Sequence, residues 1–219
     1  MPLQIVMLEK LLVQGLHKME YRGYDSAGIA LHQTDQIAHL RTLGKVKLLE
    51  EKMIAEKPKS KLGIAHTRWA THGEPSEENA HPHMSNERVY IVHNGIIENY
   101  LDLRDFLKKE GYSFSSQTDS ELIAHLLEYF LNKGNSMLDS MYLTKEKLNG
   151  AYAIAAIDKE DDQNIIIARS KSPLLIGIGM DEFLAASDPL AIGQLTNEFI
   201  FLEDRDVAEL SSERYTIFD

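Results

Sequence analysis

The 219-residue sequence predicts an α+β fold, a sandwich in which antiparallel strands pair across the sequence and helices cover them. Three observations carry this prediction. Apolar residues recur at helical spacing near the start and in the middle of the chain, and short runs rich in Ile, Leu, Val and Phe fill the last seventy residues. Strands are also expected early and late, rather than in regular alternation with helices. We expect residues 1–219 to form one domain, because a single domain of this length is ordinary.

The first expected element is an amphipathic helix over residues 6–19, where Leu8, Leu12, Leu16 and Met19 recur at helical spacing. A turn-rich segment, YRGYDSAG, follows it. SAGIALHQ and IAHLRTLG then predict two short strands joined by the polar QTDQ, and KVKLLEEKMIAEK predicts a second helix.

In the middle of the chain, LGIAH and RVYIVH predict strands on either side of a histidine-rich loop. HNG at residues 93–95 predicts a tight turn after the second strand. Helices are expected over residues 99–110, 119–133 and 135–148. QTDSE at residues 117–121 predicts a capping box, with Thr118 or Asp119 as the cap and Glu121 reaching back.

The last part of the chain predicts an antiparallel β meander, because short apolar runs are separated by Asp, Gly and Pro at nearly regular spacing. The seven runs are AYAIAAID, NIIIARS, LLIGIG, EFLAAS, FIFLE, VAELS and RYTIF.

Charge and composition exclude several classes of function. Thirty-four acidic and 23 basic residues give a formal charge of −11, and the basic residues are scattered, so neither nucleic acid nor an anionic membrane is an expected partner. No apolar run approaches the roughly 18 residues of a membrane span. The N-terminal segment lacks the pattern of a signal peptide, and we expect a cytoplasmic protein. The chain has no cysteine, so it offers no disulfide and no thiol nucleophile.

The segment HTRWATHGEPSEENAHPH, residues 66–83, raises the question of a metal site, since it holds four of the nine histidines. His66 and His72 are six positions apart across a loop, and the rings of His81 and His83 are expected to splay on an extended segment. Neither spacing is typical of zinc ligands. We therefore expect structural histidines, and no metal or cofactor.

A second interpretation of this segment is a site for a small zwitterion. Arg68 offers a planar fork for a carboxylate, and Thr71, His72 and Gly73 are possible additional donors on the same loop. Asp119 is suited to an ammonium group, so Arg68 and Asp119 complement the two ends of an α-amino acid. The alternatives are a surface ion pair for Arg68 and simple packing for the neighbouring Trp69.

HNG also has a functional interpretation besides the turn. The side-chain amide of Asn94 and the backbone N–H of Gly95 are two donors suited to a developing oxyanion, because Gly95 has no Cβ to block approach.

Six motifs together resemble one family over nearly the whole chain. They are EYRGYDSAG, GIAHTRWATHGEPSEENAHPH, VHNGIIEN, TDSELIAHL, GAYAIA and ARSKSPLLIGIG. They resemble the glutaminase domains of glucosamine-6-phosphate synthases, which are class II, N-terminal-nucleophile glutamine amidotransferases. The resemblance implies a four-layer αββα sandwich of two antiparallel sheets between helical layers. It also implies hydrolysis of L-glutamine, with the ammonia passing to a sugar-isomerase domain that makes glucosamine 6-phosphate from fructose 6-phosphate.

Site residues are implied motif by motif. Arg68, helped by Thr71 and His72, resembles the clamp on the substrate carboxylate, and Asp119 resembles the partner of the ammonium group. Asn94 and the Gly95 backbone resemble the oxyanion hole. The remaining three residues resemble supporting or gating positions: Arg22 near the nucleophile, Trp69 at the ammonia path and Tyr24 near the sugar phosphate.

The chain departs from this family at its front. Family members begin, after methionine removal, with Cys-Gly-Ile, whose cysteine is the nucleophile, whereas this chain begins MPLQIVMLEKLL. We therefore expect the first inner strand to be missing and the chain as given to be inactive. The sugar-isomerase domain is expected to be absent, and with it the main basis for a homodimer. The alternatives are a nucleophile-free glutamine-binding or regulatory module, and a metal-dependent hydrolase.

Overall fold

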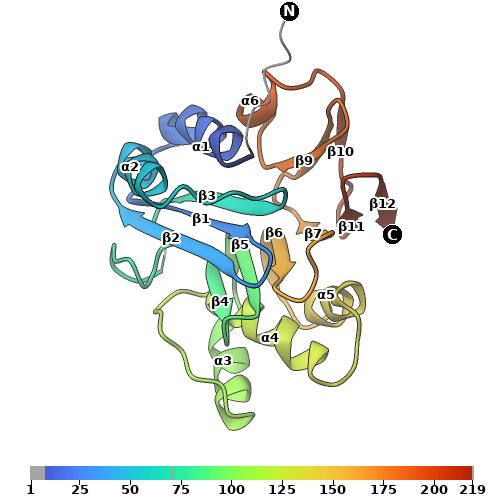
Figure 1. The fold of residues 1–219 in the computed structure, drawn as a ribbon. Helices are drawn as coiled ribbons and strands as arrows, with labels where there is room; N and C mark the ends of the chain where they lie inside the picture. Colours follow the sequence, from blue (N-terminus) through green and yellow to red (C-terminus); the bar gives the residue numbers. More distant parts are fainter. Residues whose placement is uncertain (1–7, 71, 219) are drawn as a thin grey trace, which may run out of the picture.

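The computed structural model describes residues 8–70 and 72–218 (Figure 1). The helices are α1 (Leu8–Met19), α2 (Val46–Glu56), α3 (Tyr100–Lys109), α4 (Glu121–Leu131), α5 (Met137–Lys145) and α6 (Pro189–Ile192), with a 3-10 turn η1 (Glu20–Arg22) after α1. The strands are β1 (Ser26–His32), β2 (Ile37–Leu43), β3 (Gly63–Arg68), β4 (His83–Ser85), β5 (Val89–Ile97), β6 (Gly150–Asp158), β7 (Ile165–Ser170), β8 (Leu175–Ile178), β9 (Phe183–Ala186), β10 (Phe199–Phe201), β11 (Val207–Leu210) and β12 (Tyr215–Phe218).

The strands form three sheets, with the orders β2-β1-β3, β10-β8-β9 and β12-β11-β7-β6-β5-β4. Every pairing between these strands is antiparallel. The predicted α+β class with antiparallel sheets is therefore confirmed. Among the described helices, none is both long and apolar enough to cross a membrane.

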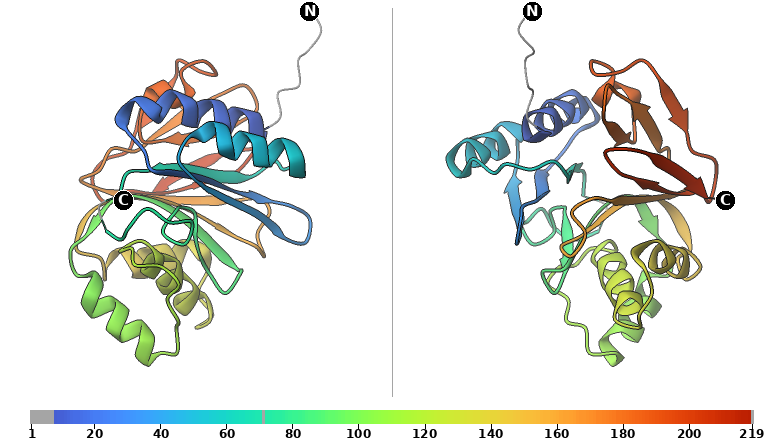
Figure 2. Two further views of the ribbon diagram at one scale, coloured as in Figure 1. Left: turned by 90° about the vertical axis from the view of Figure 1, so that its left-hand side faces the viewer. Right: turned by 45° about the vertical axis from the view of Figure 1, so that its right-hand side comes forward.

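The six-stranded sheet lies at the centre of the molecule and is covered on both faces. Helices α3, α4 and α5 lie on one face, and the two small sheets lie on the other (Figures 1 and 2). Along β6, Ile154 and Ala156 pack toward the helices, whereas Ala153 and Ile157 pack toward the small sheets. This alternation follows from the two-residue period of a strand.

The sheet β2-β1-β3 is covered in turn by α1 and α2. All seven residues of β1 are buried, because α1 and α2 lie on one side of the strand and the six-stranded sheet lies on the other. A strand buried on both faces lacks alternation of apolar and polar residues, as the sequence SAGIALH shows. The layers are thus helices, small sheets, large sheet and helices.

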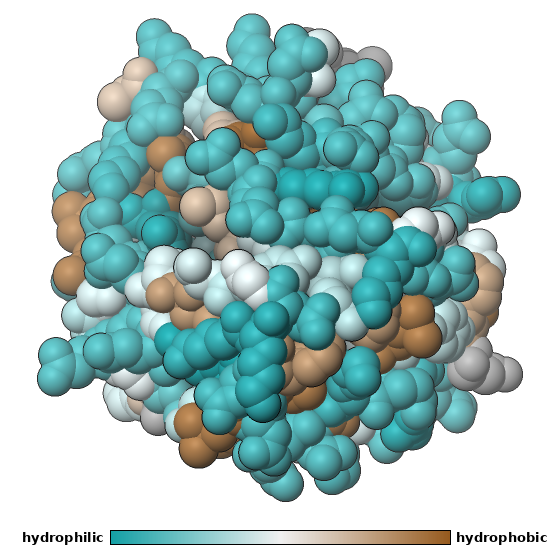
Figure 3. Space-filling model, turned by 90° about the horizontal axis from the view of Figure 1, so that it is seen from below, coloured by the Kyte–Doolittle hydropathy of each residue, from teal (hydrophilic) through white to brown (hydrophobic). Residues whose placement is uncertain are grey.

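The outer helices present polar faces to solvent. On α3, Leu103 and Leu107 are buried, whereas Asp102, Lys108 and Lys109 are exposed. The face of the molecule seen from below in the view of Figure 1 is correspondingly mostly hydrophilic, with small hydrophobic areas (Figure 3).

The helices and strands expected from the sequence are found, and their ends differ by at most four residues where both can be compared. Residues 6 and 7 of the first expected helix lie outside the described residues. The seven C-terminal runs are all strands, but the single meander is wrong. Strands β8, β9 and β10 form their own sheet, and β11 pairs with β7.

The tight turn expected at HNG is also wrong. Asn94 and Gly95 lie inside β5, opposite Ala153 and Tyr152 of β6. Gly95 has φ 147°, and a Cβ there would lie 1.9 Å from the carbonyl oxygen of Ala151. Glycine is therefore required here by the close approach of two strands, and not by a turn.

The capping box expected at QTDSE is wrong too, although α4 begins within two residues of its predicted start. Ser120 is the N-cap and makes no side-chain cap bond. Glu121 accepts from the backbone N–H groups of Ser115 and Ser116, before the helix, at 2.8 and 2.7 Å. Asp119 Oδ2 accepts from the backbone N–H of Ile97 at 2.8 Å. Asp119 thus bonds to a distant strand, and Glu121 bonds to the segment just before the helix, so neither caps α4.

Candidate functional site

A cavity of about 1260 Å³ lies between the two small sheets and reaches the ends of β3 and α4. Seven of the nine residues singled out from the sequence line it: Arg22, Arg68, Trp69, His72, Asn94, Gly95 and Asp119. Tyr24 is not among its lining residues, and Thr71 lies outside the described residues.

Arg68 ends β3 and is held from two directions. Its Nη1 lies 3.4 Å from Asp25 Oδ1, and its Nη2 donates to the carbonyl oxygens of His72 and Gly73. Only 5% of the residue is exposed, so the surface ion pair considered from the sequence is instead a buried one. These contacts use three of the five guanidinium N–H groups, which leaves two without a partner among the described residues.

Asp25 is a site residue that the sequence reasoning missed. Its Oδ1 pairs with Arg68 and accepts from the Ser26 hydroxyl at 2.9 Å, and its Oδ2 accepts from the backbone N–H of Ala70. One carboxylate thus fixes both Arg68 and the turn that follows β3. The sequence signal that could have identified Asp25 is its position at the end of the turn-rich YRGYDSAG segment, directly before the apolar strand β1.

Asp119 presents a buried carboxylate to the same cavity, with 3% of the residue exposed. Its Oδ2 is bound by the N–H of Ile97, and its Oδ1 lies 3.9 Å from His72 Nδ1. The His72 ring packs edge-on against Tyr100, with 5.2 Å between ring centroids. Folding has therefore brought together a guanidinium and a carboxylate that are 51 positions apart.

Asn94 and Gly95 line the cavity from β5. The Asn94 side chain is exposed, and the residue faces Ala153 in the strand pairing. An amide side chain and a neighbouring backbone N–H at the edge of a cavity are suited to stabilise negative charge on a carbonyl oxygen.

The three supporting residues lie at the rim or outside the cavity. Arg22 pairs with Asp188, the N-cap of α6, and donates to the Tyr21 hydroxyl. Trp69 is 66% exposed, and its ring covers Gly23, where a Cβ would lie 1.9 Å from a ring carbon. The simple packing considered from the sequence therefore holds for the contact of Trp69 with Gly23, whereas most of the residue is exposed. Burial and the Glu20 carboxylate raise the pKa of Tyr24.

The histidines form a buried stack beside the site. The ring centroids of His66 and His81 are 4.3 Å apart, and those of His81 and His83 are 4.6 Å apart, so the expected splaying of the latter pair is wrong. Burial, reinforced by His93 and Arg68, lowers the pKa of His66 to about 3. Burial likewise lowers the pKa of His83 to about 3. Within residues 8–70 and 72–218, no group of three side chains has the arrangement of a metal site.

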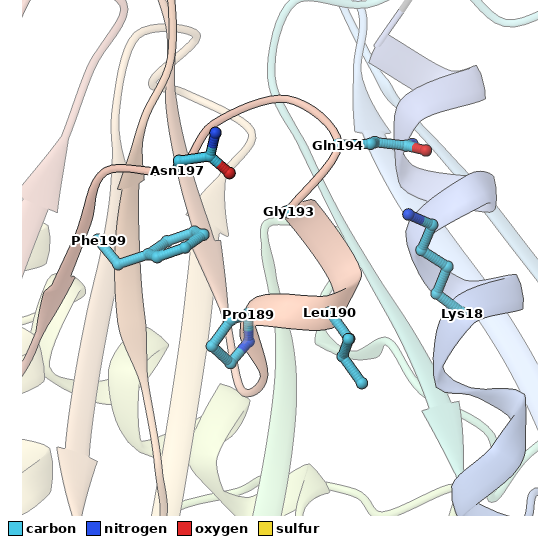
Figure 4. A pocket seen from close by; sticks show the side chains of 7 residues that line it. All are labelled: Lys18, Pro189, Leu190, Gly193, Gln194, Asn197 and Phe199. Carbon is cyan, nitrogen blue, oxygen red and sulfur yellow. The ribbon is translucent and has the colours of Figure 1, made fainter.

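A second hollow, of about 350 Å³, lies between α1 and α6 (Figure 4). Lys18 is the only charged residue among those that line it, and none of the residues singled out from the sequence lies there. The larger cavity is therefore the candidate active site.

Comparison with known proteins agrees with the motifs. Residues 66–194 match the family described as "Glutamine amidotransferase domain". The chain is 49% identical over 211 residues to a glutamine–fructose-6-phosphate aminotransferase (isomerizing) of Vibrio parahaemolyticus, and 50% identical over 212 residues to one of Haemophilus influenzae. Each match covers 96% of this chain but 34% of the relative, so the chain spans about a third of the length of these relatives.

Solved structures show the same fold. A glutamine phosphoribosylpyrophosphate amidotransferase from B. subtilis, complexed with ADP and GMP, superposes with a TM-score of 0.82 at 24% identity. A structure described as the allosteric regulatory enzyme of purine biosynthesis superposes with a TM-score of 0.83 at 25% identity. Each covers 95% of this chain and 46% of the solved chain. From its sequence and its fold, the chain belongs to the class II glutamine amidotransferase domains of the glucosamine-6-phosphate synthase family.

Proposed function

We propose that this chain is the glutamine-binding and glutamine-hydrolysing part of an enzyme that converts fructose 6-phosphate to glucosamine 6-phosphate. The observation that carries the proposal is the meeting of Arg68 and Asp119 in one cavity with Asn94 and Gly95. A guanidinium and a carboxylate complement the two charged ends of an α-amino acid. The amide donors then face the side-chain carboxamide.

In this proposal Arg68 binds the α-carboxylate of L-glutamine through its two remaining N–H groups, together with His72 and Thr71. Asp119 accepts from the α-ammonium group through Oδ1. Asn94 Nδ2 and the Gly95 N–H stabilise the oxyanion that forms when a nucleophile adds to the carboxamide carbon. The C–N bond then breaks as nitrogen is protonated, ammonia leaves, and water releases glutamate from the acyl intermediate.

The family resemblance assigns the nucleophile to a cysteine at the start of an inner strand, and the 219 residues contain no cysteine. We propose that such a strand fits the groove between β3 and β9. Both strands are edges of their sheets, and every residue of each lines the cavity. Helix α1 lies over the groove, and Val92 and Ala155 lie beneath it. An added strand would pair with two otherwise open edges and end beside Arg68.

The name of the relatives, glutamine–fructose-6-phosphate aminotransferase (isomerizing), suggests a sugar-isomerase domain as a further partner. A sugar-isomerase domain would receive the ammonia, and we propose that Trp69 gates its path; the exposure of Trp69 and its position among the residues that line the cavity support this. The chain as given has a second candidate function, as a nucleophile-free module that binds glutamine without cleaving it. The absence of any thiol favours this for the 219 residues alone.

Two measurements test the proposal. L-Glutamine should bind the chain as given in a calorimetric or NMR titration, and Arg68→Met should abolish the binding. The chain preceded by a Cys-Gly-Ile strand should release glutamate and ammonia in equal amounts, whereas the chain as given should release neither. A folded Cys-containing protein that binds glutamine but does not hydrolyse it would leave only the binding module, and failure to bind glutamine would contradict both functions.

A further inference from the structure

The two polar ends of the candidate clamp come from segments that are far apart in the sequence, and one buried side chain bonds to both. Asn79 lies in the histidine-rich loop and is 3% exposed. Its Nδ2 donates to the carbonyl oxygen of Glu74 at 2.8 Å, within the loop. Its Oδ1 accepts from the backbone N–H of Gln117 at 2.8 Å, two residues before Asp119.

Gln117 completes the connection from the other side. Its Oε1 lies 3.4 Å from Asn79 Nδ2 and also 3.4 Å from the backbone N–H of Glu74. The loop and the segment before α4 are thus joined by a small cyclic set of hydrogen bonds. Since Asn79 and Gln117 are 38 positions apart, the bonds between them join distant segments, whereas the bond from Asn79 to Glu74 lies within the loop.

The loop backbone lies directly against this pair of side chains. Gly73 has φ 76°, and a Cβ there would lie 2.7 Å from Asn79 Nδ2 and 3.0 Å from Gln117 Cβ. The carbonyl oxygen of the same Gly73 accepts from Arg68 Nη2 at 3.2 Å. A continuous set of contacts therefore runs from Arg68 through Gly73, Asn79 and Gln117 to the segment that carries Asp119.

The loop has other anchors that hold it against β2 and α2. Arg41 Nη1 donates to the carbonyl oxygens of Glu78 and Ala80, both at 3.2 Å, and Lys52 Nζ pairs with Glu77 at 3.1 Å. None of these reaches the segment before α4. Thr118 Oγ1 and His83 Nε2, 3.1 Å apart, also join the two segments, but at the start of β4. Asn79 and Gln117 make the connection that lies against Gly73, so they bear on the distance between the two ends of the site and not on the existence of the loop.

We propose that Asn79 and Gln117 are positioning residues that set the separation between the carboxylate-binding and the ammonium-binding ends of the site. This inference rests on the proposed function. Neither residue touches the substrate; each acts through the backbone that carries Arg68, His72 and Asp119. A ligand that needs both ends at once depends on that separation, whereas a ligand with a single charged end adapts to either side.

The test compares three ligands in titrations of the folded chain: L-glutamine, 4-carbamoylbutanoate, which lacks the amino group, and 4-aminobutanamide, which lacks the carboxylate. For Asn79→Ala and for Gln117→Ala we expect the affinity advantage of glutamine over the one-ended ligands to fall about tenfold. The affinities of the one-ended ligands should change less than about twofold. The double variant should be no worse than either single one, because both remove the same connection.

Lys52→Ala is the matched control, since it removes a bond of the same loop and leaves the Asn79–Gln117 pair in place. Gln117 is exposed, so we expect Gln117→Ala to fold. If Asn79→Ala does not fold, the comparison of the three ligands is made with Gln117→Ala. If the variants lose affinity equally for all three ligands, or lose none, the positioning role is wrong. In either case, binding of glutamine by the unaltered chain still supports the proposed function. If the unaltered chain binds no glutamine, the proposed function fails first, and this inference fails with it.

Discussion

The Asp25 carboxylate lies 3.4 Å from the Arg68 guanidinium, measured from Oδ1 to Nη1, and the side chains are 18% and 6% exposed. Asp25 precedes β1 and Arg68 ends β3, and Ser26 and Arg68 face each other in the pairing of these strands. The antiparallel register therefore delivers the ion pair to the edge of the cavity. Removing one partner of a buried pair leaves the other charge uncompensated.

Asp25→Asn should weaken glutamine binding about tenfold or more, although Asp25 is not proposed to touch the ligand. The reason is that Arg68 and the N–H of Ala70 lose the charge that fixes them. Calorimetric titration measures the affinity. Asp188→Asn, which breaks the Arg22 pair at the rim, is the control and should have the smaller effect. Equal losses for the two variants would contradict the role given to Asp25.

Gly95→Ala should destabilise the fold by more than about 3 kcal/mol, because strained φ adds to an impossible contact with the Ala151 carbonyl. Gly111→Ala separates the two effects. Gly111 also has positive φ, 94°, but its Cβ would meet no atom within 4 Å, so we expect a loss of about 1 kcal/mol. Urea unfolding of both variants measures the difference. Similar losses would show that the close approach of β5 and β6 relaxes readily.

Acid should destabilise the protein below about pH 6.5 through the buried histidines. Burial lowers the pKa of His66 and of His83 to about 3, from an ordinary value of 6.5. Between these values the unfolded chain binds protons that the folded chain does not. The free energy of unfolding should therefore fall as pH falls, by up to about 1.4 kcal/mol per pH unit for each histidine.

Urea unfolding at pH 7.5, 6.5 and 5.5 measures this slope. His83→Asn should reduce it, because one of the titrating groups is removed. A free energy of unfolding that is independent of pH in this range would contradict the buried neutral stack.

Glu121→Gln should cost about 2–3 kcal/mol at neutral pH. Burial opposes the charged carboxylate, but the nearby His125 and hydrogen bonds from Ser116 and Ser115 outweigh it and lower the pKa of Glu121 to about 2. The charged form therefore stabilises the fold above pH 4.5, and this contribution is lost as pH falls toward 2.

The variant should also flatten the dependence of stability on pH below 4.5. The exposed Glu110→Gln is the control and should leave both quantities unchanged. A Glu121→Gln protein as stable as the unaltered chain would show that its bonds with Ser115 and Ser116 contribute little.

The spacing of apolar residues along the chain predicted most helices and strands, because burial of one face repeats apolar residues at the period of the helix or strand. The apolar stripe of α1 and the seven C-terminal runs were visible in the sequence for this reason. The pattern does not record which edges meet, so it did not separate β8, β9 and β10 from the six-stranded sheet. The turn predicted at HNG is wrong for the same reason. From the sequence, a glycine that permits the close approach of Ala151 cannot be distinguished from a glycine that permits a turn.

By itself, the sequence determined the α+β class, the elements, the family motifs and the residue types of the candidate clamp, since these depend on side-chain chemistry and spacing along the chain. Only the tertiary structure decided that Arg68 is a buried partner of Asp25, that Asp119 binds the N–H of Ile97 rather than capping α4, and that Asn79 joins the loop to Gln117. Each of these is a contact between distant segments. Hydrogen bonds and charges select partners by position in space, and that position exists only after the sheets have paired and packed.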